Sequence, residues 1–176
     1  VIEAGLKLAG GKCIVNSINL EDGEAKLERV CPMLKRFGAA VVALTIDEHP
    51  EEAMAKTRDR KVAIARRIHD LCVNKYGLKS QDIFFDCLTT GNEDDRRLAL
   101  ETLDGIEGIA ADMPECGLIL GVSNVSFGLD PAARAVLNSV FLHEAMRRGL
   151  TAAIVHASKI LPRNKISDER WDVALN

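Results

Sequence analysis

Polar side chains follow five short apolar runs of this sequence, and these side chains are its candidates for chemistry. In chain order they are Asn16, Ser17 and Asn19; Asp47 and Glu48; Asp86; Ser123, Asn124 and Ser126; and His156, Ser158 and Lys159. Most are uncharged donors or acceptors, and the sequence contains no convincing Ser-His-Asp order, no HExxH motif and no metal-ligand spacing. Such a set suits recognition of a neutral heterocycle that is rich in hydrogen-bonding groups.

The apolar runs themselves are predicted to be strands of a parallel sheet. They are nearly continuous in apolar residues rather than alternating, which is typical of strands covered on both faces. The runs are Lys12–Ile18, Ala39–Ile46, Asp82–Phe85, Gly117–Gly121 and Ala152–Val155. Helical spacing is found between them, in Glu21–Phe37, Lys61–Tyr76, Arg96–Met113 and the segment that Asp130-Pro131 begins. Gly77, Gly117 and Gly149 are predicted to end helices. In such α/β sheets functional groups gather at the carboxyl ends of the strands.

The repeat length of this pattern predicts an α/β fold of the barrel type. The strand-to-strand distance is roughly 35 residues, so eight units would need about 280, the usual range for a (β/α)8 barrel. The opening residues VIEAGLKLAGGK read as the last turns of a helix that stops at Gly10-Gly11. We therefore expect residues 1–176 to form the C-terminal part of a TIM barrel, about five β/α units, with the N-terminal strands missing. An open doubly wound sheet is the alternative, but no GxGxxG loop or P-loop favours it.

Composition places the chain among cytoplasmic globular proteins. The net charge is -3, which argues against nucleic-acid binding, because nucleic-acid binders usually carry a basic surplus. No apolar run approaches the roughly 20 residues that cross a bilayer, so no membrane partner is expected. The five cysteines are scattered and form no CxxC pair, as expected for reduced thiols in the cytosol.

Longer segments resemble the pterin-binding family over essentially the whole chain. They are GKCIVNSINLEDGE, GAAVVALTIDE, DIFFDCLTTGNEDDRR and GLILGVSNVSFGLDPAARAVLNSVFLHEAMRRGL. Within the family they are similar to the methyltetrahydrofolate-binding domains of cobalamin-dependent methionine synthases and of related corrinoid-protein methyltransferases. SNVSFG is highly specific, whereas VNSIN and FFD are weak alone. The sister group, the dihydropteroate synthases, typically has Ser-Arg-Lys in place of Ser123-Asn124-Val125. The resemblance thus favours methyl transfer over pteroate synthesis.

The resemblance also implies roles for residues at the strand ends. Asp86 matches a carboxylate that accepts two hydrogen bonds from the pterin, each contributing roughly 1.5–3 kcal/mol. Asn16 matches a residue that hydrogen-bonds the ring. Asn124 matches the catalytic asparagine that reaches N5, the atom bearing the methyl group, and its amide can donate or accept as N5 changes protonation. The other expected substrate-binding residues are Gly121, whose lack of a side chain lets the ring approach, Ser126 and Arg134.

The activity implied by the resemblance is transfer of the N5-methyl group of methyltetrahydrofolate to cob(I)alamin, and thence to homocysteine. Cobalamin is expected on another domain or protein, zinc only in a separate homocysteine domain, and no metal on this chain. The expected partners are the folate and a cobalamin-binding domain or corrinoid protein. The fragment alone is expected to be inactive, because the family's third-strand Asp-Ser pair would lie before Val1. A non-catalytic pterin-binding module completed by another chain, or a dihydropteroate synthase, are the alternatives.

Other charged and polar residues are expected to have structural roles. Asp47 and Glu48 read as loop charges or helix caps, and the basic stretch Arg58–Arg67 as a solvated helix face. Arg134 is as well suited to supporting the SNVSFG loop as to touching a ligand. Three histidines, His49, His69 and His143, are expected to be surface or partly buried residues rather than ligands. His156 lies on the rim, where a structural hydrogen bond is at least as well suited to it as a ligand contact.

Three departures from the family pattern surround the expected site. Cys87 replaces the proline that usually follows the aspartate, and we expect it to be a small buried residue. The loop Leu88–Asn92 is shorter than usual, and His156-Ala157 stands where Asn-Pro or Asn-Ala is commoner. The first two departures affect the loop geometry next to Asp86.

Overall fold

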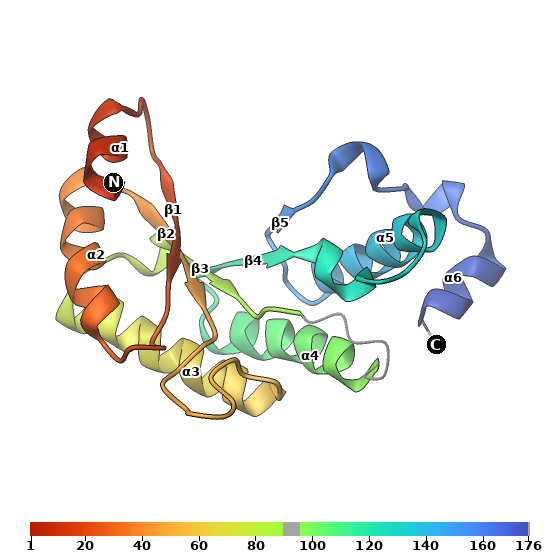
Figure 1. The fold of residues 1–176 in the computed structure, drawn as a ribbon, viewed down its shortest axis with the longest axis horizontal. Helices are drawn as coiled ribbons and strands as arrows, with labels where there is room; N and C mark the ends of the chain where they lie inside the picture. Colours follow the sequence, from red (N-terminus) through yellow and green to blue (C-terminus); the bar gives the residue numbers. More distant parts are fainter. Residues whose placement is uncertain (90–95, 176) are drawn as a thin grey trace.

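Five parallel strands alternate with helices in the computed structural model, which describes residues 1–89 and 96–175 (Figure 1). The strands are Ile14–Ile18 (β1), Ala40–Leu44 (β2), Ile83–Asp86 (β3), Gly117–Gly121 (β4) and Ala152–Ile154 (β5). The α-helices are Ile2–Leu8 (α1), Ala25–Phe37 (α2), Arg58–Asp70 (α3), Arg96–Asp112 (α4), Pro131–Arg147 (α5) and Asp168–Leu175 (α6). These elements confirm the five predicted strands and the helices between them.

The sheet order is β1-β2-β3-β4-β5, with every neighbouring pair parallel. Each strand therefore lies beside the next one in the chain, and the order contains no reversal of the kind that defines a doubly wound sheet. In Figure 1 the sheet curls, and α2, α3 and α4 lie along its outer side. The arrangement is a half-barrel, which confirms the predicted partial (β/α) barrel.

Alternation along the strands divides the side chains between the helix layer and the inner face of the half-barrel. The helix-facing side chains in the main core include Val41, Ala43, Ile83, Phe85, Leu118 and Leu120. Asn16, Asp86 and Gly121 have the opposite parity, because Asn16 pairs with Val42 and Asp86 lies two residues after Phe84. Since parallel partners point to the same face, these three residues share the inner face.

Helix termini follow the predicted signals, with one exception. The Asp130 side chain accepts hydrogen bonds from the backbone N–H groups of Ala132 and Ala133, which caps α5. Gly77 and Gly149 adopt φ angles of 68° and 109° after helical segments, as predicted. Gly117 was predicted to end a helix, and this is wrong because it is the first residue of β4. A Cβ there would lie 2.3 Å from Phe84 Cδ1, so packing of that ring explains the glycine.

Two helices at the ends of the sequence frame the half-barrel. The opening residues form α1, as the pattern predicted. Helix α6 was not predicted, since its only buried side chain is Trp171, which packs with Val140 and Ile166 in a small second cluster. That tryptophan also contacts the ring of His143 edge-on at a centroid distance of 5.1 Å. The second cluster fixes α6 against α5.

Candidate functional site

The predicted site residues lie at the carboxyl ends of neighbouring strands, on the inner face. Asp86 ends β3 and Gly121 ends β4, and adjacent strands are about 4.8 Å apart. Asn124 follows in the 3-10 turn Val122–Ser126. Asn16 lies on β1, two strands away from β3. The fold therefore gathers these four residues along one edge of the half-barrel.

The strand register places Asn16 and Asp86 in the same layer of the barrel. Asn16 pairs with Val42, Val42 pairs with Phe84, and Asp86 is two residues further along β3. In an eight-stranded barrel the register advances by about one residue per strand, and inward side chains of alternate strands form a layer. The offset of two residues across two strands equals this stagger. Asn16 and Asp86 are therefore suited to contact one flat ligand.

Asp86 is a buried carboxylate with only one oxygen engaged. The residue is 7% exposed, and its Oδ1 accepts a hydrogen bond of 2.8 Å from the backbone N–H of Leu88. Within residues 1–89 and 96–175 its Oδ2 has no hydrogen-bond partner. Burial raises the pKa of Asp86 to about 6, although the Leu88 N–H and the charge of Lys61 lower it. The carboxylate is thus ionised at neutral pH and has acceptor capacity to spare.

Lys61 was predicted to lie on a solvated helix face, and this is wrong. The residue is 2% exposed, and its ammonium donates to the backbone carbonyls of Ala55 at 2.8 Å, Leu88 at 3.1 Å and Cys87. Burial lowers the pKa of this lysine. A sequence signal was available: Lys61 precedes Ala65 and Ile68 by four and seven residues, which puts it on the buried stripe of α3.

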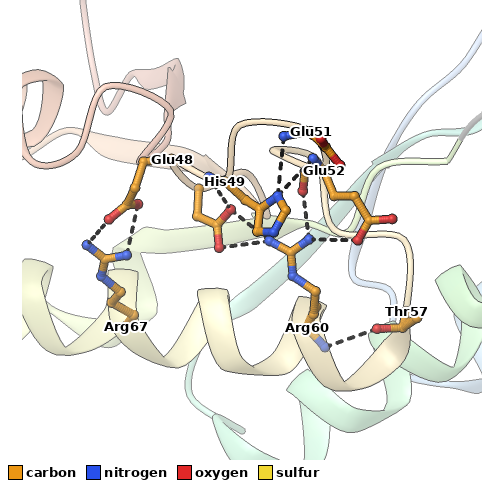
Figure 2. A network of polar contacts seen from close by, with 8 residues as sticks. Glu48, His49, Glu51, Glu52, Thr57, Arg60 and Arg67 are labelled. Atoms are coloured by element: carbon orange, nitrogen blue, oxygen red, sulfur yellow. Dashed lines mark hydrogen bonds and ion pairs between the residues drawn. The ribbon is translucent and has the colours of Figure 1, made fainter.

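Asp47 and Glu48, which follow β2, are held by arginines of α3. Figure 2 shows Glu48 opposite Arg67 and, in the same loop, Glu52 beside Arg60. Arg60 Nη2 donates to both Asp47 carboxylate oxygens at 2.8 and 2.9 Å. Arg67 contacts both oxygens of Glu48 at 2.8 and 2.9 Å. In the same loop His49 Nδ1 accepts from the backbone of residues 51 and 52 (Figure 2). These contacts confirm that the two carboxylates are structural charges of the loop.

Ser126 and Arg134 support the loop that carries Asn124. Ser126 is fully buried; its hydroxyl donates to the carbonyl of Ser123 at 3.2 Å and accepts from Arg134 Nε at 3.1 Å. A second guanidinium nitrogen, Nη2, donates to the Ser123 carbonyl at 3.3 Å. Both residues thus contact the loop itself, and a direct contact with substrate stays a prediction.

Asn124 and Gly121 have no structural task that their residue types explain. Asn124 is exposed, and its side chain forms no hydrogen bond within the described part of the chain. Gly121 has a φ of -78°, which any residue can adopt, and a Cβ there would meet no atom within 4 Å. The space beside Gly121 is therefore open on the protein side. Asn124 lies three residues after Gly121, in the turn that follows β4.

The remaining predicted rim residues have ordinary surroundings. His156 is exposed and its Nδ1 lies 3.0 Å from Ser158 Oγ, which confirms a structural hydrogen bond. Cys87 is fully buried, as predicted, and burial raises the pKa of its thiol to about 12. The short loop predicted at Leu88–Asn92 lies outside the described residues from position 90 onward.

Two further observations concern the described residues 1–89 and 96–175. They contain no cluster of three or more His, Cys, Asp or Glu side chains that could hold a metal ion, and no helix among them could span a membrane. A hollow of about 1030 Å³ lies between α4, α5, α6 and the loop after β4; Val125, between Asn124 and Ser126, lines it, whereas none of the predicted site residues does.

Comparison with known proteins agrees with this geometry. The profile of a family described as pterin binding enzyme matches residues 1–156. Methionine synthase of Mycobacterium tuberculosis (strain ATCC 25618 / H37Rv) is 47% identical over 183 aligned residues, which cover all of this chain and 15% of the relative. Methionine synthase of Mycobacterium leprae (strain TN) is 45% identical with the same coverage. The chain therefore spans about 15% of the length of the curated relatives it matches.

Proposed function

This chain belongs to the family of pterin-binding enzymes, and from that premise we propose that it binds 5-methyltetrahydrofolate and supports transfer of the N5-methyl group to cob(I)alamin in methionine synthesis from homocysteine. The observation that carries the proposal is Asp86, a buried carboxylate on the inner face with one oxygen unengaged within the described residues. The names of the two relatives support the reaction.

The carboxylate of Asp86 suits the edge of a pterin, which presents a ring N–H beside an exocyclic amino group. An ionised carboxylate accepts from two such donors, and each charged hydrogen bond contributes roughly 1.5–3 kcal/mol. Burial excludes competing water and strengthens these bonds. Asn16, in the same barrel layer, supplies a further amide for the polar edge of the ring.

Asn124 is the residue that we assign to the methyl-bearing nitrogen. A neutral tertiary amine is a poor leaving group, so N5 needs a proton or a strong hydrogen bond as the methyl group departs. An exposed amide with no intramolecular partner among the described residues can donate to N5 or accept from it. The open approach at Gly121 leaves room for the ring beside that amide.

Cobalamin, held on another domain or protein, would supply the nucleophile that takes up the methyl group. The residues of this chain would then contribute position and electrostatics, holding the folate ring in line and stabilising the nitrogen that loses the methyl group. We propose that zinc and homocysteine chemistry belong to a separate domain. The half-barrel at residues 1–176 would form only part of the pterin-binding domain.

A second candidate is a pterin-binding module without catalytic activity, completed by another chain. The observation that favours it is the position of β1 and β5, which form the two edges of the curled sheet. Open edges of this kind accept further strands. Pteroate synthesis is disfavoured by Ser123-Asn124-Val125, which lacks the lysine typical of that sister group.

Replacing Asn124 by alanine in the full-length natural protein separates these functions. The methyltransferase proposal predicts a loss of about a hundredfold in the single-turnover rate of methyl transfer, with a much smaller loss of folate affinity. Asn74→Ala, which removes an exposed asparagine far from the strand ends, serves as the control. A change in affinity alone would support the binding module, and unchanged rate and affinity would refute the role of Asn124.

A further inference from the structure

A buried lysine lies beneath the turn that follows β3. The Nζ atom of Lys61 donates to the carbonyls of Cys87 and Leu88, the two residues directly after Asp86, and to the carbonyl of Ala55 in the loop before α3. All three donor positions of the ammonium are therefore used. The lysine connects α3, its preceding loop and the turn beside the predicted pterin-binding carboxylate.

Surrounding residues make room for the lysine and stabilise the same turn. Gly105 lies inside α4, and a Cβ there would be 2.6 Å from Lys61 Cδ, so the glycine allows the lysine side chain to pass. Thr102 Oγ1, one turn earlier on α4, donates to the Leu88 carbonyl at 3.0 Å. Leu88 has a φ of 51°, a conformation that non-glycine residues rarely adopt. These contacts hold the Leu88 N–H toward Asp86 Oδ1.

From this arrangement we propose that Lys61 is a positioning residue for Asp86. Its ammonium fixes the Cys87–Leu88 turn, so that the Leu88 N–H holds one carboxylate oxygen and leaves the other for the ligand, and its charge favours the ionised carboxylate. The inference rests on the proposed pterin-binding role of Asp86. According to this proposal, Lys61 affects ligand affinity although it lies on α3 and outside the barrel mouth.

The charges around the lysine support an electrostatic role. Three groups raise the pKa of Lys61 against the effect of burial: Cys87, Asp86 and, from α4, Glu101. Glu101 is engaged by the backbone N–H of Arg58 at 2.6 Å, and Cys87 is a buried thiol. Asp86 is thus the carboxylate at the strand end that this cation faces. An apolar side chain of the same length would fill the space but would not favour ionisation of that carboxylate.

The test measures the affinity of the full-length protein for 5-methyltetrahydrofolate as a function of pH. The unsubstituted protein should lose affinity as pH falls through about 6, the pKa of Asp86. In Lys61→Met this midpoint should move up by about one pH unit. Lys61→Arg, which keeps the cation, and Lys79→Met, which removes an exposed lysine before β3, should keep the original midpoint.

An affinity loss in Lys61→Met that is equal at every pH, with an unchanged midpoint, would overturn the inference because it would indicate packing alone. If Lys61→Met does not fold, the same pH titration of folate affinity is made with Gly105→Ala, because the added Cβ would displace the aliphatic part of the Lys61 side chain. A raised pH midpoint in this variant would support the inference, and an unchanged midpoint would refute it.

Failure of the proposed folate-binding function can be distinguished from failure of the inference about Lys61. If the unsubstituted protein binds no reduced folate at any pH, that function fails, and unfolding experiments decide the inference. The stabilising protonation of Asp86 should then persist about one pH unit higher in Lys61→Met than in Lys79→Met. An equal pH dependence would refute the inference.

Discussion

Two strand ends of this half-barrel carry carboxylates, and they differ in what the carboxylates contact. At the end of β2, Asp47 and Glu48 each face an arginine of α3 that contacts both of their oxygens. At the end of β3, Asp86 is buried, and a single backbone N–H engages one of its oxygens within the described residues. The first region uses its charge to fix a loop. The second holds a charge that its own surroundings leave partly unmatched, which is typical of a binding site.

The largest effect on stability should come from Asp86→Asn. The raised pKa means that protonation of Asp86 stabilises the fold; this contribution is fully present below its ordinary value of 3.8 and is lost as pH rises through about 6. The neutral amide should therefore raise the free energy of unfolding at pH 7 by on the order of 2–3 kcal/mol. Chemical denaturation at pH 7 and pH 4 measures this gain, which should vanish at the lower pH. A loss of stability at pH 7 would contradict the account.

The second effect is the pH dependence of folate affinity. Between pH 7 and pH 5 the ionised fraction of Asp86 falls about tenfold, because its pKa is about 6. The affinity of the full-length protein for 5-methyltetrahydrofolate should fall by about the same factor. The Asp86→Asn variant provides the matched control, and its weak residual affinity should lack this transition. An identical pH profile in both proteins would exclude Asp86 as its source.

A smaller effect is expected at the structural end of β2. Asp47→Asn removes a charge from a partly buried pair with Arg60 and should lower the free energy of unfolding by about 1 kcal/mol. Folate affinity should stay the same, because this carboxylate is already held by the arginine. Thermal unfolding and calorimetric titration of the same preparation check both statements. A marked loss of folate affinity in Asp47→Asn with unchanged stability would contradict the account, because it would make the end of β2 a binding region.

The smallest effect should be that of Glu48→Gln. The Arg67 guanidinium holds the pKa of Glu48 below its usual range, but both side chains are largely exposed. Exposed ion pairs contribute little because water and salt screen them, so Glu48→Gln should change the free energy of unfolding by less than about 0.5 kcal/mol. Denaturation in low and high salt measures this difference. If Glu48→Gln changed the free energy of unfolding more than Asp47→Asn does, exposure would not explain how much each ion pair contributes to stability.

Much of the fold could be predicted because its strands are short, nearly continuous apolar runs, and the three central strands, β2, β3 and β4, are largely buried. The polar residues at the ends of those runs were likewise visible, and the SNVSFG motif singled out Asn124. The pairing of Asp47 with Arg60 was not visible, since it depends on how the intervening loop returns to α3. The role of α6 was also missed, because one buried tryptophan gives little periodic signal.

Lys61 shows a different limit. It was grouped with a basic stretch, where charge composition suggested solvent, although its spacing from Ala65 and Ile68 placed it on the buried stripe. Its acceptors are backbone carbonyls from two distant segments, and no side-chain pattern records such acceptors. The sequence predicted Asp86 as the ligand-binding carboxylate, whereas its burial and its electrostatic interaction with Lys61 became visible only in the fold.

Calorimetric titration of the full-length natural protein with 5-methyltetrahydrofolate at pH 7 tests the central claim most directly, by comparing Asp86→Asn with Asp47→Asn. We predict that Asp86→Asn lowers the affinity by about ten- to a hundredfold, because a charged acceptor is lost, while Asp47→Asn binds like the unsubstituted protein. Equal affinities for the two variants would contradict the assignment of Asp86 as the pterin-binding carboxylate.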